Sequence, residues 1–299
     1  MSGVGNIYDL GYQGYSGPRR GRPAVVASFL RSTLAAAYGI GRGGRAKIAP
    51  FAFLILAILP AVIAVGITAL AAQAGAAEFL DEASPIRHAT YQGLTSTLIM
   101  LFCAAQAPEL FGRDQRYGVL PLYFSRVLTR FDYALGRLGG LFLAVFVICV
   151  TPQILLTIGA FMAAADPGEA FAEQAVEVPR YLVLCLLASG LLAAVGGVIA
   201  AWTPRRAYAT AAIIAVFIIP PIVVLLLAEL AVGDLASVLV LFSPPDILDG
   251  LNAALYDTVP DSPAVSAADL PGWAYFAAAV AWIVASVSLI IRRYLVVGG

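Results

Sequence analysis

Charge is the first thing that this sequence lacks. Only 12% of its residues are charged and 61% are hydrophobic, whereas a soluble globular chain carries about 25% charged residues. The mean hydropathy is +0.89. Basic and acidic residues number eighteen each, so the net charge is zero and gives no sign of a nucleic-acid partner. The composition excludes an ordinary soluble domain and places the chain in the membrane class.

Residue types that carry most enzyme chemistry are also scarce. The chain has one histidine, His88, which we expect in a solvated external loop, and three cysteines, Cys103, Cys149 and Cys185. Each cysteine stands alone in an apolar run, without the close spacing of a metal site, which predicts three buried thiols. Glu229 is the one acid well inside an apolar run, and its place near the external end predicts that it reaches the membrane surface.

A nucleotide-binding loop is missing as well. The glycine-rich segment 39–47 reads GIGRGGRAK, which does not have the spacing GxxxxGK[ST] and does not follow a strand. We therefore expect no ATPase site, no metal and no cofactor in this chain, and we do not expect it to be an enzyme by itself.

Long apolar runs dominate what remains. A helix rises about 1.5 Å per residue and the hydrocarbon core is about 30 Å thick, so a membrane span needs roughly twenty apolar residues. Six stretches reach that length, and Pro108 with Glu109 is expected to end the second of them. The stretches are about 49–72, 91–108, 138–165, 180–202, 207–232 and 272–291. The predicted fold class is an all-α integral membrane protein with six transmembrane helices.

The basic residues predict the direction of these spans, because arginine and lysine are retained in cytoplasmic loops. Sixteen of the eighteen lie before the first span, between the second and third, between the fourth and fifth, or after the sixth. Only Arg87 and Arg180 fall on the other side. With six spans both termini share one side, so both are predicted to be cytoplasmic.

Two further segments lie outside the spans. Residues 1–48 are expected to form a cytoplasmic tail followed by a helix at about 24–38, which is too short to cross a membrane and has the apolar spacing of an interfacial helix. Residues 49–299 then form the six-span domain. The connector 233–271 is apolar at first and is broken by a Ser-Pro-Pro-Asp sequence, which predicts a re-entrant or interfacial hairpin between spans five and six.

The stretch between the second and third spans is charged and rich in aromatic residues. Thr129-x-x-Asp132 has the form of a capping box and predicts the start of the next helix. Gly118 and Pro121 break the segment before it into short pieces. A helix over 119–128 would place Leu120, Tyr123 and Phe124 on one side.

This stretch resembles the cytoplasmic loop between spans two and three of ABC-2 type transporter permeases. In that loop an acid is followed by an Arg/Asp cluster, a glycine, a leucine-rich short helix, a Ser-Arg pair and an Asp-Tyr helix start with Gly-Arg. The matching positions are Glu109, Arg113, Asp114, Arg116, Gly118, Leu120, Leu122, Ser125, Arg126, Asp132, Tyr133, Gly136 and Arg137. Val127 stands where the family often has proline. The six spans, the interfacial helix and the hairpin are also features of the family.

The resemblance implies a permease subunit of an ATP-driven exporter in a bacterial cell membrane. Such a subunit contacts membrane lipids, pairs with a second permease, identical or related, and binds two separate ATPase subunits that hold the ATP and Mg²⁺. The loop 109–137 would be the contact that couples the ATPase to the spans. The implied coupling residues are Glu109, Arg113, Asp114, Arg116, Tyr117, Gly118, Leu120, Tyr123 and Arg126.

Two other classes of function are weighed beside this one. A membrane-embedded enzyme would need polar groups that converge near one membrane face, and an ion-coupled carrier would show internal repeats and polar groups at mid-span. The sequence shows neither pattern clearly. It also leaves the cargo open, although apolar spans suit a lipid-like or amphipathic molecule.

Overall fold

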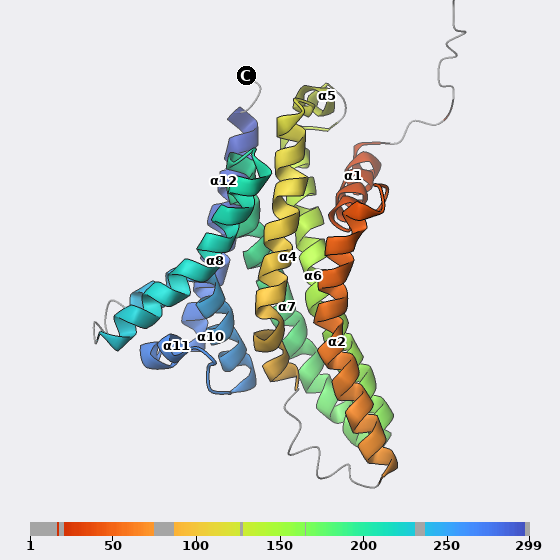
Figure 1. The fold of residues 1–299 in the computed structure, drawn as a ribbon, viewed down its shortest axis with the longest axis vertical. Helices are drawn as coiled ribbons and strands as arrows, with labels where there is room; N and C mark the ends of the chain where they lie inside the picture. The colour runs from red at the N-terminus through yellow and green to blue at the C-terminus, as the bar shows by residue number, and fades with distance from the viewer. Residues whose placement is uncertain are drawn as a thin grey trace, which may run out of the picture.

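A computed structural model describes residues 17, 21–74, 87–125, 128–164, 166–230 and 237–296. The regular structure of these residues is helical throughout, which confirms the predicted all-α class (Figure 1). Most of the N-terminal tail and two residues of the coupling stretch, Arg126 and Val127, lie outside the described residues. The helices are α1 (Arg22–Ala37), α2 (Arg45–Gln73), α4 (His88–Arg116), α5 (Leu120–Phe124), α6 (Arg130–Ala163), α7 (Pro167–Trp202), α8 (Arg206–Glu229), η1 (Val240–Phe242), α10 (Pro244–Tyr256), α11 (Pro263–Ala268) and α12 (Gly272–Val296).

Six helices of the described chain are long and apolar enough to cross a membrane. They are α2, α4, α6, α7, α8 and α12, and each contains most of one predicted stretch. Helix α6 is central, because it packs against α1, α2, α4, α7 and α12. The prediction of six spans is therefore confirmed at the level of helix number and position.

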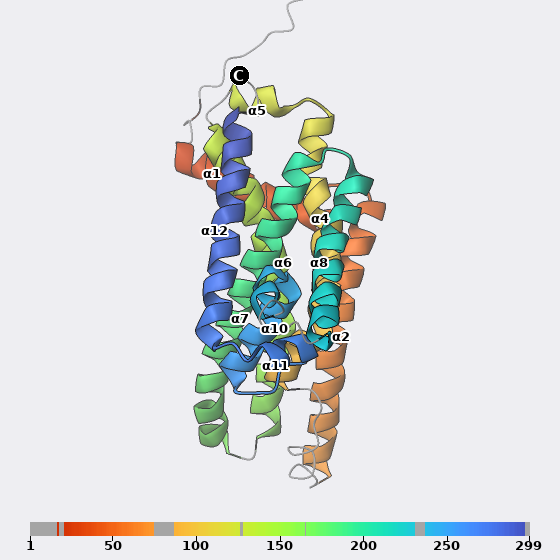
Figure 2. The ribbon, with the colours of Figure 1, turned by 90° about the vertical axis from the view of Figure 1, so that its left-hand side faces the viewer.

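The start of α1, the short helix α5 and the end of α12 lie at one end of the bundle, at the top of Figures 1 and 2. The turn between α7 and α8, which carries Arg205 and Arg206, lies toward the same end. We call it the basic end, and we call the other the opposite end. Which compartment each end faces stays a prediction.

We predicted that the second span ends at Pro108, but helix α4 continues for two further turns to Arg116. A proline inside a helix loses one backbone hydrogen bond. Here the loss is offset by packing, because Pro108 and the following Leu110 and Phe111 are buried and α4 packs against α6, α7 and α8. The helix ends instead at Arg116, just before Gly118, whose φ of +63° suits glycine. Most of the described part of the coupling stretch is therefore helix rather than loop.

Helix α1 crosses α6 at close range. A Cβ atom added to Gly136 would lie 2.4 Å from the Phe29 ring, and one added to Gly140 would lie 2.4 Å from the Thr33 side chain. Both partner side chains are buried, so only glycine permits this approach. The predicted helix at 24–38 is present as α1, and its position along a membrane surface stays a prediction.

Short helices fill the connection between α8 and α12. Helices α10 and α11 pack together, and α10 also packs against α4, α7, α8 and α12. Ile247 and Leu251 of α10 are buried, and the Trp282 indole N–H of α12 donates to the Leu241 carbonyl over 3.1 Å. The connector is thus a helical element within the bundle, while its re-entrant course through a membrane stays a prediction.

Candidate functional site

Exposure divides the predicted coupling residues that the structure describes into an inner and an outer set. They occupy the end of α4, the turn after it and α5. The inner set is held in protein contacts, whereas the outer set is open to solvent and Tyr123 is half-buried. The inner residues are Glu109, Asp114 and Leu120, the outer ones are Arg113, Arg116, Tyr117 and Gly118, and Arg126 lies outside the described residues.

Asp114 forms a buried ion pair between α4 and α6. Its carboxylate accepts hydrogen bonds from the Arg137 guanidinium and, over 2.8 Å, from the Tyr133 hydroxyl. The Arg137 and Asp114 side chains are 9% and 11% exposed. The guanidinium also lies 5.0 Å from the centre of the Phe29 ring of α1. Because a buried charge is tolerated only when paired, Asp114 joins α1, α4 and α6 rather than presenting itself to a partner.

Glu109 is a second internal junction. One carboxylate oxygen lies 3.1 Å from Arg42, in the turn between α1 and α2, and the other lies 2.5 Å from Arg206 at the start of α8. Arg42 also donates to the Ala36 carbonyl near the end of α1 over 2.6 Å. A single carboxylate therefore ties two parts of the chain to α4, the turn between α1 and α2 and the start of α8.

Asp132 closes the start of α6. It completes the predicted capping box with Thr129, since each side chain accepts from the other's backbone N–H over 3.1 Å. The same carboxylate accepts two hydrogen bonds of 3.0 Å from Arg22 of α1. This hydrogen-bonded contact raises the pKa of Arg22 above its ordinary value. The first turn of α1 is thereby fastened to the first turn of α6.

The remaining helices at this end are joined by hydrogen bonds that are not ion pairs. The Gln115 amide donates to the Ala201 carbonyl of α7 and to the Tyr294 hydroxyl of α12, both over 3.0 Å. The Arg130 guanidinium donates to the Leu295 carbonyl over 2.7 Å. We call the whole set of polar contacts the basic-end network. It consists of Arg22, Arg42, Glu109, Asp114, Gln115, Arg130, Asp132, Tyr133, Arg137, Arg206 and Tyr294.

A small exposed surface projects from this network. Tyr117 is 73% exposed and Leu122 is 68% exposed, although both are large side chains with apolar area. Of the α5 side chains only Leu120 is buried, and α5 lies at the extreme basic end beside the end of α12 (Figures 1 and 2). Arg113 and Arg116 flank these residues. We call Arg113, Arg116, Tyr117 and Leu122 the tip surface.

Sequence reasoning missed several members of the network. Arg22, Arg42 and Arg206 come from other helices or turns, and no spacing along the chain links them to Glu109 or Asp132. Asp132, Tyr133 and Arg137 were part of the recognised motif, yet they were not expected as site residues. The sequence did contain one indication, which was the acid Glu109 at the end of an apolar run. A carboxylate in that position usually pairs with a cation.

His88 is a clear correction. We expected a solvated loop residue, but it is the first residue of α4 and only 9% exposed. Its Nδ1 lies 2.6 Å from the Gln153 side-chain oxygen of α6, and its ring stacks on Tyr181 of α7 with centroids 5.2 Å apart. The burial arises because Tyr181 of α7 and Gln153 of α6, both within predicted spans, pack against the first turn of α4.

The three cysteines lie within the apolar helices α4, α6 and α7. Cys103, Cys149 and Cys185 are free and buried, as expected. Within the described ranges, no three His, Cys, Asp or Glu side chains gather as metal ligands would. Glu229 is the last residue of α8 and is exposed.

No protein-family model matches this sequence, and no curated protein matches it. Function must therefore be argued from the residues and their geometry.

Proposed function

We propose that this chain is the permease subunit of an ABC-2 type ABC transporter, an exporter in a bacterial cell membrane with both ends in the cytoplasm. The observation that carries the proposal is the exposed tip surface fastened, through the basic-end network, to most of the apolar helices. The motif between spans two and three and the asymmetry of the basic residues support the same reading.

The network would act as the mechanical link. An ATPase subunit that closes on ATP must move the spans, so its contact with the permease has to be stiff. Helix α4 runs without interruption from the apolar bundle to Arg116, which belongs to the tip surface. Glu109 and Asp114 connect this helix to α6, α8 and the turn before α2, so a push at the tip would be shared among them.

The tip surface has the chemistry of a protein contact. Aromatic and arginine side chains provide most of the binding energy in many interfaces, and a short helix can dock into a groove through its apolar face. Tyr117 and Leu122 would enter such a groove, while Arg116 would pair with acidic groups on its rim. The expected partners are two ATPase subunits, which would hold ATP and Mg²⁺, and a second permease.

Purification from native membranes tests the partnership. The tagged full-length chain should carry a P-loop ATPase with it, identified by mass spectrometry. The double variant Arg116→Glu/Leu122→Glu should lower the ATPase activity of the purified complex about tenfold or more, because both side chains would face the partner. The amount of folded permease should not change, since both residues are exposed.

A matched control comes from the opposite end. Glu173 of α7 is also exposed, and Glu173→Arg should leave the ATPase activity unchanged. If no ATPase accompanies the permease, or if the tip variant retains full activity in the complex, the proposed coupling role is wrong.

A further inference from the structure

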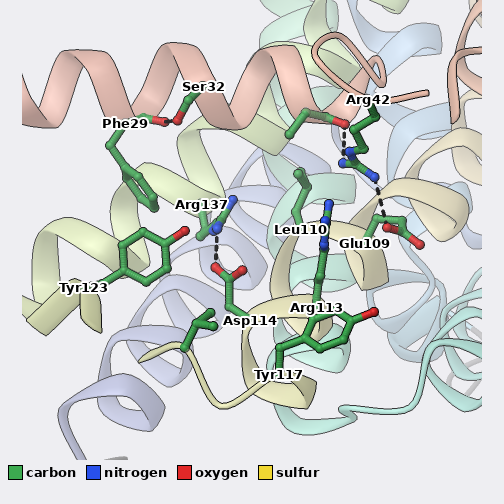
Figure 3. A pocket seen from close by; sticks show the side chains of 12 residues that line it. Phe29, Ser32, Arg42, Glu109, Leu110, Arg113, Asp114, Tyr117, Tyr123 and Arg137 are labelled. Atoms are coloured by element: carbon green, nitrogen blue, oxygen red, sulfur yellow. Dashed lines mark hydrogen bonds and ion pairs between the residues drawn. The ribbon is translucent and has the colours of Figure 1, made fainter. Parts of the chain in front are cut away.

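A polar pocket lies directly beneath the tip surface. Its volume is about 410 Å³, within the roughly 300–1,000 Å³ typical of small-ligand sites. It is bounded by α1, the turn before α2, the end of α4, the turn into α5 and the start of α6 (Figure 3). Parts of the chain that are distant in sequence therefore form its walls.

The pocket has a surplus of positive charge. Three arginines line it, Arg42, Arg113 and Arg137, together with two carboxylates, Glu109 and Asp114. Arg42 and Arg137 each pair with one carboxylate. Arg113 has no ion pair with any residue that the structure describes, and its side chain points into the pocket toward α1 (Figure 3). One full positive charge in the pocket is thus uncompensated.

A second, independent feature points to the same kind of ligand. The Arg137 Nε–H has no hydrogen-bond acceptor among the described residues, although the Arg137 side chain is only 9% exposed. Buried donors are nearly always bonded. Tyr117 and Tyr123 also line the pocket, and the Tyr123 hydroxyl points toward Arg137 as a further donor (Figure 3). Donors therefore outnumber the acceptors that the protein supplies here.

We propose that this pocket binds a phosphate group. Guanidinium groups bind phosphate through parallel N–H donors, and here they come from the turn before α2, from α4 and from α6. A tetrahedral phosphate has several oxygens that can accept from donors placed on different walls, whereas a planar carboxylate has two. Arg113 provides the neutralising charge, and Arg137 and the Tyr123 hydroxyl provide further donors.

Two sources of phosphate fit this position. The pocket lies against α1, so the headgroup of an anionic phospholipid in the adjacent leaflet could reach it. A soluble phosphate compound could enter from the aqueous side. The assignment of this end to the cytoplasm rests on the proposed function, but the binding itself does not. Because Tyr117 belongs both to the pocket and to the tip surface, an occupied pocket would fix the position of the tip.

Binding to the purified permease, without any ATPase, tests the proposal. Short-chain phosphatidylglycerol is titrated against the detergent-solubilised chain and followed by native mass spectrometry, with a short-chain diacylglycerol as the phosphate-free comparison. Inorganic phosphate is titrated separately and followed by calorimetry. We expect one of the two phosphate probes to bind at a single site, and the one that binds identifies the source, while diacylglycerol is not retained there.

Variants assign the site. Arg113→Gln should weaken binding about tenfold or more, the cost of losing a charged hydrogen-bond partner. Arg113→Lys keeps the positive charge but loses the paired N–H donors of the guanidinium, so its affinity should lie between those of wild type and Arg113→Gln. Arg116→Gln removes a neighbouring exposed charge outside the pocket and should bind as wild type does. Both glutamine variants leave the buried pairs intact, so folding is not at risk.

The opposite results overturn the proposal. Equal losses in Arg113→Gln and Arg116→Gln would mean diffuse attraction rather than a site. If neither phosphate probe binds, and Arg113→Gln instead weakens a co-purifying ATPase, the pocket receives an acidic side chain of that partner. Absence of any ATPase would refute the proposed function while leaving the phosphate measurement unaffected.

Discussion

The two ends of the helical bundle hold their polar groups in different ways. At the basic end each inward-facing carboxylate has an arginine, as in the pairs of Asp114 with Arg137 and of Glu109 with Arg42. At the opposite end the described residues form one ion pair, Arg180 with Glu177, and the other contacts are hydrogen bonds without a paired opposite charge, such as that of His88 with Gln153. Removing one partner of a buried ion pair leaves an uncompensated charge and should destabilise the protein strongly. Removing one partner of a hydrogen bond without paired charges should cost less.

The carboxylate of Asp246 at the start of α10 sharpens this contrast. It is 3% exposed, and one oxygen accepts from the Ser262 hydroxyl over 3.0 Å. The other oxygen has no hydrogen-bond partner among the residues described, and no ion pair of the described chain includes it. Neutralising a carboxylate without a cation, by acid or by substitution with asparagine, should stabilise the protein. Neutralising one of the paired carboxylates at the basic end should destabilise it.

Breaking the Asp114 pair should have the largest effect. Asp114→Asn leaves the Arg137 charge buried without a counter-charge, which should lower the free energy of unfolding by about 3–5 kcal/mol. Thermal unfolding in detergent would measure this. The double variant Asp114→Leu/Arg137→Met removes both charges and should recover most of the loss. A loss below about 1 kcal/mol in Asp114→Asn would mean that the pair is not buried in solution.

The matched change at the opposite end should cost less. His88→Phe keeps a ring that can stack on Tyr181 but removes the hydrogen bond to Gln153. One buried amide then loses a partner, so the expected cost is about 1–3 kcal/mol in the same unfolding assay. Gln153→Leu in the His88→Phe background should restore part of it. A cost equal to that of Asp114→Asn would erase the difference between the two ends.

The hydropathy pattern predicted the fold well because the membrane fixes span length. It did not predict that α4 continues through Pro108. The backbone hydrogen bond that the proline removes can be seen in the sequence, but the packing against α6, α7 and α8 that offsets this loss cannot. It placed His88 in a loop for a related reason. The residues that cover His88, Gln153 and Tyr181, lie 65 and 93 positions along the chain, and no local spacing links them to it.

The sequence predicted which charged residues gather at the candidate site, but it did not predict which of them are buried in ion pairs and which are exposed. The motif located the charged residues of the basic end, yet it could not separate Asp114, which is buried, from Arg116, which is exposed. That separation depends on partners such as Arg42 and Arg206, whose distances to Glu109 are set by the packing of whole helices. Spacing along one segment carries no such information.

Titration of Asp246 tests the unpaired carboxylate. Burial raises the pKa of Asp246 above its ordinary value, so the folded state favours the protonated form. Its contribution to stability is therefore present below the unfolded-state pKa of about 3.9 and is lost as the pH rises through the folded-state value. We expect Asp246→Asn to gain stability relative to wild type as the pH is raised from acid to neutral. Parallel pH profiles of the two proteins would contradict this.

The smallest effect is expected where an ion pair of the basic end is exposed. The Arg22 side chain is 57% exposed, although it makes two hydrogen bonds to Asp132. Water and salt screen such a pair, and the capping box with Thr129 stays intact without it. Arg22→Gln should therefore change the unfolding temperature barely measurably, and the change should vanish in high salt. A loss comparable to that of Asp114→Asn would show that connection between helices, rather than burial, determines how much an ion pair at this end contributes.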